Sequence, residues 1–171
     1  MSAYLRTTRE CSFVQFHPEL RQAIQNYFRE HALGDPETEA LMCCETISEK
    51  KKAGRLASWL DDSVDTTIHT GMLLTPQWLV WVHHGDRSGT LLNAADLKLI
   101  GAAAHTSLFS KDAGLDVVGY IGDTKVRVQG TIAMGDGPAT QKFCDAVKQA
   151  LAKANPPVAK KRLFGLPFGR S

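Results

Sequence analysis

The pattern of hydrophobic and polar residues divides this chain into a helix, a β-rich middle and a second helix. Over residues 17–33, apolar residues recur every three or four positions, which predicts an amphipathic helix. Pro18 suits the first helical turn, and Gly34 suits the position after the last one. The apolar stripe must pack on another surface, either the outside of the β-rich region or a second subunit. The stripe consists of Leu20, Ile24, Tyr27 and Phe28.

Short runs rich in β-branched and aromatic residues, separated by turn residues, predict antiparallel strands in the middle of the chain. The strongest signal is a hairpin of residues 66–75 and 78–84. Its turn contains Pro76, which is tolerated there because a turn position needs no amide donor. The other predicted strands are residues 40–49, 90–92, 96–101, 107–109, 115–121 and 124–133.

Two sets of turn residues predict where the later strands end. Asn93, Ala94 and Ala95 predict a break between the strands at 90–92 and 96–101. Gly122 and Asp123 are a strong signal for a tight hairpin turn before the last strand.

A final helix is predicted to begin at Pro138 and to end before Pro156. Its apolar stripe contains Phe143, Val147 and Leu151. We expect this stripe to close one open end of the β structure against Trp78, Val80 or other strand residues.

Six or seven antiparallel strands followed by one helix is the order of the pleckstrin-homology (PH) superfold. Residues 71–75 (GMLLT), three spacer residues and residues 79–82 (LVWV) resemble the G-x-L-x-x-T … R-L-h-h signature of the GRAM and bacterial PH-like families. Residues 96–100 (DLKLI) are similar to the D-I-x-x-V strand that follows it. Trp78 stands where these families commonly have a basic residue.

The resemblance implies an α+β fold, a PH-like curved antiparallel β-barrel or sandwich capped by a C-terminal helix. The predicted organisation is an N-terminal helical extension at 1–36, the PH-like domain at 37–155 and a basic tail at 156–171. The two families are mostly binding modules for lipid headgroups or protein partners. The resemblance therefore implies binding rather than catalysis.

The composition is that of an ordinary globular protein, with 171 residues, 43% hydrophobic and 22% charged. A net charge of +2 gives no general attraction to nucleic acid, so no nucleic-acid partner is expected. No apolar run approaches the roughly 18 residues of a membrane-spanning helix. The first residues also lack the apolar core of a signal peptide. These features predict a cytoplasmic location, with peripheral membrane association as the alternative.

Cysteine and histidine residues are the candidates for chemistry. The four cysteines (Cys11, Cys43, Cys44, Cys144) form no C-x-x-C pair, and adjacent His83 and His84 point to opposite faces of a strand, so no metal site is predicted. By the same alternation, one of Cys43 and Cys44 should be buried and the other not. We expect Cys144 to be buried beside Phe143. No nucleophile, phosphate-loop or metalloprotease motif occurs, and no cofactor is expected. A small enzyme using a cysteine or histidine in a cleft remains the alternative to a binding module.

Two basic segments are the candidate binding sites. Within the PH-like interpretation, the first lies in the loop between the first two strands, where lipid-binding members hold phosphates. It would bind an anionic lipid or a phosphate. An acidic run at 61–65, which we expect to be an exposed turn, would weaken the positive electrostatic potential of this loop. The predicted ligand-binding residues are Lys50, Lys51, Lys52 and Arg55.

The second candidate site is the C-terminal tail, which contains basic residues and interleaved apolar and aromatic ones, and no acidic residue. Such a segment can dock in a partner's groove or contact a membrane. The sequence therefore predicts a binding or assembly module for a protein partner or a second copy of the chain, with anionic lipid as a weaker alternative. The predicted tail residues are Lys160, Lys161, Arg162, Leu163 and Phe164.

Overall fold

The computed structural model describes residues 3–51, 64–106, 113–122, 124 and 126–156. The strand predicted at 107–109 lies outside these ranges. The elements in chain order are β1 (Tyr4–Cys11), a 3-10 turn (Phe13–Gln15), α1 (Pro18–Glu30), α2 (Pro36–Glu39), β2 (Met42–Lys50), β3 (Thr67–Leu74), β4 (Trp78–Gly85), β5 (Gly89–Asp96), β6 (Ile100–Thr106), β7 (Ala113–Gly119), β8 (Val128–Met134) and α3 (Pro138–Ala154).

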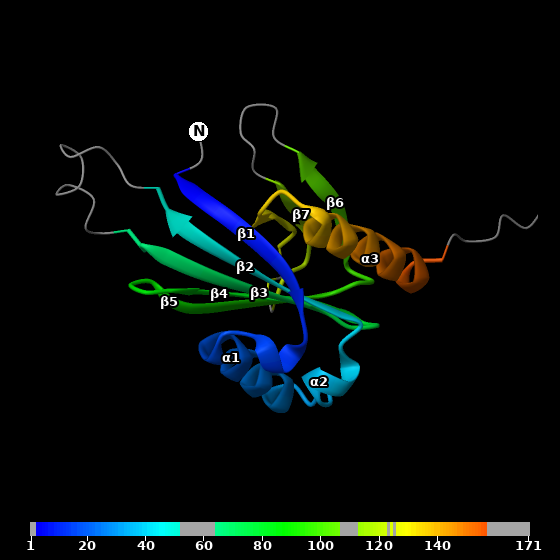
Figure 1. The fold of residues 1–171 in the computed structure, drawn as a ribbon. Helices are drawn as coiled ribbons and strands as arrows, with labels where there is room; N and C mark the ends of the chain where they lie inside the picture. The colour runs from blue at the N-terminus through cyan, green and yellow to red at the C-terminus, as the bar shows by residue number, and fades with distance from the viewer. Residues whose placement is uncertain (1–2, 52–63, 107–112, 123, 125, 157–171) are drawn as a thin grey trace, which may run out of the picture.

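The strands form two separate antiparallel sheets. One has five strands in the order β1-β2-β3-β4-β5, and the other has three in the order β6-β7-β8. Figure 1 shows α1 and α2 on one side of the five-stranded sheet, and α3 with β6 and β7 on the other. The predicted α+β class is confirmed, and the sheets are not joined into a closed barrel. No helix in the described ranges is long and apolar enough to cross a membrane.

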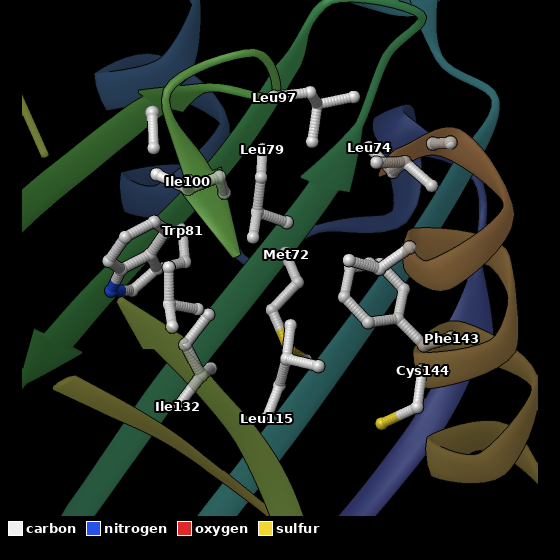
Figure 2. Packing of buried hydrophobic residues seen from close by; sticks show 14 of the residues in the cluster. Met72, Leu74, Leu79, Trp81, Leu97, Ile100, Leu115, Ile132, Phe143 and Cys144 are labelled. Atoms are coloured by element: carbon white, nitrogen blue, oxygen red, sulfur yellow. The ribbon is translucent and has the colours of Figure 1, made fainter. Parts of the chain in front are cut away.

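The inner core lies between the two sheets and α3. Phe143 and Val147 of α3 are fully buried in it against Met72, Leu74 and Leu79. Figure 2 shows Trp81 and Phe143 on opposite sides of this cluster, with Met72 and Leu79 between them. The stripe on α3 therefore packs in the core as predicted.

Helix α3 packs against other strand residues than the two that were named as its expected partners on β4. Trp78 and Val80 lie on the opposite face of the sheet, in the outer core, because successive strand residues alternate between faces. Leu79 and Trp81 take the inward positions instead.

The outer core lies between α1 and the five-stranded sheet. Leu20, Ile24 and Phe28 are fully buried there, against residues of β3, β4 and β5 that include Leu73 and Val80. Of the two surfaces that could cover the stripe, the structure uses the chain's own sheet. Because helices and strands cover both faces, Cys43 and Cys44 are both buried, one in each core. The prediction that one of them is exposed was therefore wrong.

Three local predictions differ from the structure. Strand β1 was not predicted, because residues 4–11 are mostly polar and pair only as an edge strand with β2. Residues 93–95 continue β5 rather than breaking it, since Ala94 and Ala95 fit where both faces are covered. The β7–β8 pairing stops at Gly119 and Val128, and the Gly122 N–H donates to the Ala94 carbonyl at 2.7 Å. This bond ties the loop to β5. The Thr124 N–H also donates to the Ile121 carbonyl, so a turn forms at the predicted place, but β7 and β8 separate before it and do not make a tight hairpin.

Candidate functional site

A pocket of about 280 Å³ opens between the two sheets. It is bordered by β8, by the inward faces of β4 and β5, and by the loop before β8. This part of the inner core is not covered by α3, which packs against β1, β2, β6 and β7. The lining residues are Trp81, Asn93, Ile121, Thr124, Val128, Gln129, Gly130, Thr131 and Ile132.

The floor of the pocket carries two hydrogen-bonding side chains that have no partner. Trp81 and Asn93 are paired across β4 and β5 and point to the same face. In the described part of the chain, neither the Trp81 indole N–H nor the Asn93 carboxamide makes a hydrogen bond. Trp81 is 6% exposed, so the indole is held in place while its N–H can be reached from the pocket.

Gly130 leaves the space that the pocket occupies. It pairs with buried Val117 and faces inward between Val128 and Ile132. A Cβ atom added at Gly130 would meet no atom within 4 Å, so the site has room for a side chain that the residue lacks. The sequence signal that could have indicated this space is the lone glycine in the alternating run 126–132.

The same face of the sheet continues beyond the pocket. His83 and Leu91 are the next inward pair along β4 and β5. Leu91 is 62% exposed, whereas the His83 Nδ1 lies 2.9 Å from the Thr70 hydroxyl. Burial lowers the pKa of His83, which keeps this surface uncharged at neutral pH.

A second polar cluster lies on the outer face, where α1 begins. The nearly buried Glu45 carboxylate accepts a hydrogen bond from the Arg9 guanidinium at 2.6 Å, and His69 Nδ1 lies 3.1 Å from its other oxygen. The His17 ring lies 4.3 Å from that of His69 and 5.4 Å from that of His84. Burial, and then His69 and His84, lower the pKa of His17.

The His17 ring is stacked on that of His84, at an interplanar angle of 20°, and is tilted by 32° from that of His69. A metal ion lies close to the plane of each imidazole that binds it, so rings that face one another in this way do not direct their nitrogens at one point. Among the residues with described positions, no group of three or more histidine, cysteine or acidic residues could hold a metal ion. The cluster attaches the start of α1 to the sheet.

The predicted basic loop is described only at its beginning. Lys50 ends β2, and the Lys51 N–H donates to the Ala3 carbonyl at 2.9 Å. Lys52 and Arg55 lie outside the described residues, as do Asp61 and Asp62. The acidic run was predicted to be an exposed turn, which is wrong for Asp65.

Asp65 is buried, and its side chain accepts hydrogen bonds from the backbone N–H groups of Arg87 and Ser88 at 2.6 and 2.9 Å. Hydrogen bonds from Ser88 and then Arg87 lower the Asp65 pKa to about 2. The carboxylate therefore holds the β4–β5 turn.

The predicted tail site, Lys160–Arg162 with Leu163 and Phe164, also lies outside the described residues. The helix that precedes it ends where the Asn155 amide donates to the Leu97 carbonyl at 2.9 Å. The Leu97 N–H in turn donates to Gln77 in the β3–β4 turn. Lys50 is at the other end of the strands, so the two basic segments leave the fold at opposite ends.

The cysteine side chains are reduced, and none of them hydrogen-bonds a histidine within the described ranges. The Cys144 thiol donates to the Gly114 carbonyl instead. Burial raises the pKa of Cys11 to about 11 and that of Cys43 and Cys44 to about 12, and it also raises that of Cys144. Such thiols are poor nucleophiles at neutral pH.

Comparison of the chain with protein-family models, with curated proteins and with solved structures finds no match.

Proposed function

We propose that this chain is a non-catalytic binding module for a protein partner, and that the partner binds at the pocket between the sheets. The observation that carries the proposal is the pair of unpartnered side chains on the pocket floor, Trp81 and Asn93, in front of the empty position at Gly130. Neither group is fully enclosed, so both are open to a ligand from the pocket. A partner that offers hydrogen bonds to both replaces the water that hydrates them in the free chain.

The chemistry of the lining favours recognition over catalysis. Its polar groups are an indole, two carboxamides and two hydroxyls, none of which exchanges a proton readily near neutral pH. The raised pKa values of the thiols also speak against a cysteine nucleophile. These features support a binding module over the small-enzyme alternative.

We also propose that the scaffold is PH-like. The support is the order of the elements from β2 to α3: four antiparallel strands, three more in a second sheet, and a final helix packed on both sheets. Strand β1 and helix α1 are then additions to that scaffold. Because α1 occupies the outer face, it leaves the inner pocket as the open binding surface.

The test is a selection of random peptides displayed on phage against the wild-type chain, followed by affinity measurement with two variants. Gly130→Leu fills the pocket from β8. Gly101→Leu is the matched control, since Gly101 is in the same sheet and an added Cβ would make only an ordinary contact with Val118. We expect selected peptides to bind wild type and Gly101→Leu alike, and to bind Gly130→Leu at least about tenfold more weakly.

Peptides that bind Gly130→Leu as tightly as wild type would contradict the proposal, and so would a selection that yields no binder. A melting temperature of Gly130→Leu close to that of wild type shows that the variant is folded. Co-sedimentation with phosphatidylserine vesicles that is unaffected by Gly130→Leu would favour the anionic-lipid alternative.

A further inference from the structure

We propose that the partner binds as an extended segment, which adds to the free edge of β8 as a new antiparallel or parallel strand and places one side chain in the pocket. This inference rests on the proposed function above and specifies the form of the ligand. The observation behind it is that consecutive residues of β8 line the pocket.

Five consecutive residues of β8, from Val128 to Ile132, border the pocket. Successive strand residues point to opposite faces, so the side chains of Gln129 and Thr131 point away from the inner face. Both residues line the pocket nevertheless, because Gly130 between them has no side chain to cover their main chain. The pocket therefore reaches main-chain atoms of β8, beside the edge of this strand that pairs with no other strand in the described ranges.

Strand β8 is the last strand of its sheet, and β7 is its only strand partner among the described residues. Its far end is closed off, because the Gly135 N–H donates to the Thr8 hydroxyl of β1 at 2.7 Å. The available edge is thus about five residues, or roughly 16 Å at about 3.3 Å per residue. An extended segment of this length can form main-chain hydrogen bonds with it.

The pocket beside this edge selects the anchor side chain. Ile121, Val128 and Ile132 form apolar walls, and Trp81 and Asn93 offer hydrogen bonds at the floor. No charged side chain is among the lining residues that the structure describes. An ionised anchor would therefore lose its hydration without gaining a counter-charge. The fitting side chain has an apolar stem and an uncharged hydrogen-bonding end, as glutamine and tyrosine have.

The test uses a peptide selected on the wild-type chain and two scans of its sequence. In the first scan, each backbone nitrogen is methylated in turn, which removes one N–H and blocks one side of the peptide chain. We expect losses of about tenfold or more at every second position along the bound segment and little change at the positions between. In the second scan, alanine at the anchor position should cause a comparable loss, and lysine there a larger one.

A third measurement is made on the protein. Addition of the same peptide should slow hydrogen exchange of backbone amides in β8, while amides of β1, the edge strand of the other sheet, should be unchanged.

The outcomes separate the two proposals. A peptide whose binding is lost in Gly130→Leu, but whose methylation scan shows no alternation and whose binding leaves exchange in β8 unchanged, overturns strand addition and leaves the pocket as a side-chain site. A peptide that prefers an acidic or basic anchor contradicts the assignment of the anchor. Peptides that are indifferent to Gly130→Leu overturn the proposed function together with this inference.

Discussion

At the scale of single residues, Gly130 keeps space open at a cost in stability. A glycine inside a strand is less stable than alanine by roughly 0.5–1 kcal/mol, and an added Cβ at Gly130 would touch nothing. We therefore expect Gly130→Ala to raise the free energy of unfolding by about that amount. Gly114→Ala should lower it, because a Cβ there would overlap the Ile132 carbonyl oxygen. Urea unfolding measures both, and a destabilised Gly130→Ala would show that the space in front of the strand is needed by the fold.

Asp65 should make the stability of the fold depend on pH in the acid range. Its pKa is lowered from 3.8 to about 2 by the bonds that hold the turn after β4, so the unfolded chain binds the proton more tightly. The stability it contributes is complete above about pH 4 and is lost as the pH falls through about 2. Asp65→Asn should be less stable at neutral pH and should lose less stability between pH 4 and 2. Denaturant unfolding across this range tests it, with exposed Asp136→Asn as the control.

At the scale of elements, the packing of α3 should contribute strongly to the stability of the inner core. Phe143 is fully buried, so Phe143→Ala should lower the free energy of unfolding by about 3–5 kcal/mol. The neighbouring Lys142→Ala removes only an exposed ion pair with Glu10 and should cost less than about 1 kcal/mol. Unfolding in guanidinium distinguishes the two. Equal effects would mean that α3 is not an essential part of the core.

The attachment of α1 should also weaken as the pH falls, but at a higher pH than the turn held by Asp65. The pKa of His17 is lowered from 6.5, so protonation favours the unfolded chain, and the stability is complete above about pH 6.5 and falls below it. Glu45 and Glu19 partly offset the effect of burial and of His69 and His84. His17→Phe should therefore lose less stability than wild type between pH 7 and 5.

His31→Phe, at the exposed end of the same helix, serves as the control for His17→Phe. Hydrogen exchange of the α1 amides at the two pH values locates the effect. Lower protection factors at pH 5 than at pH 7, in wild type and His17→Phe alike, would contradict the role of His17.

Elements with strong local signals could be predicted from the sequence, and the site could not. Pro18 and Pro138 begin both long helices as expected, and the β3–β4 hairpin has nearly its predicted limits. Strand β1 lacks an apolar alternation, so only its pairing with β2 defines it. The pocket depends on Trp81 and Gly130, which are far apart in the chain. Only the crossing of the two sheets brings them together, and no local pattern encodes that crossing.

At the scale of the whole molecule, both faces of the five-stranded sheet are largely covered, and the inner face is open at the pocket and at exposed Leu91 beyond it. Helix α1 covers the outer face, while β6–β8 and α3 cover the inner one. The two basic segments predicted as binding sites begin at opposite ends of this fold, at Lys50 and after Asn155. Neither Lys50 nor Asn155 lines the pocket.

This arrangement predicts weak attraction to anionic membranes. Each cation near such a surface gains about 1 kcal/mol, within a Debye length of about 8 Å. Exposed Glu49 and Asp86 lie at the same end of the strands as Lys50 and oppose that gain. We expect no co-sedimentation with phosphatidylserine vesicles at physiological salt. Any binding at low salt should fall both after charge reversal of Lys50, Lys51, Lys52 and Arg55 and in a chain ending at Asn155. Binding that persists at physiological salt and is lost on charge reversal would make the loop a lipid site and would favour the anionic-lipid function over a protein partner.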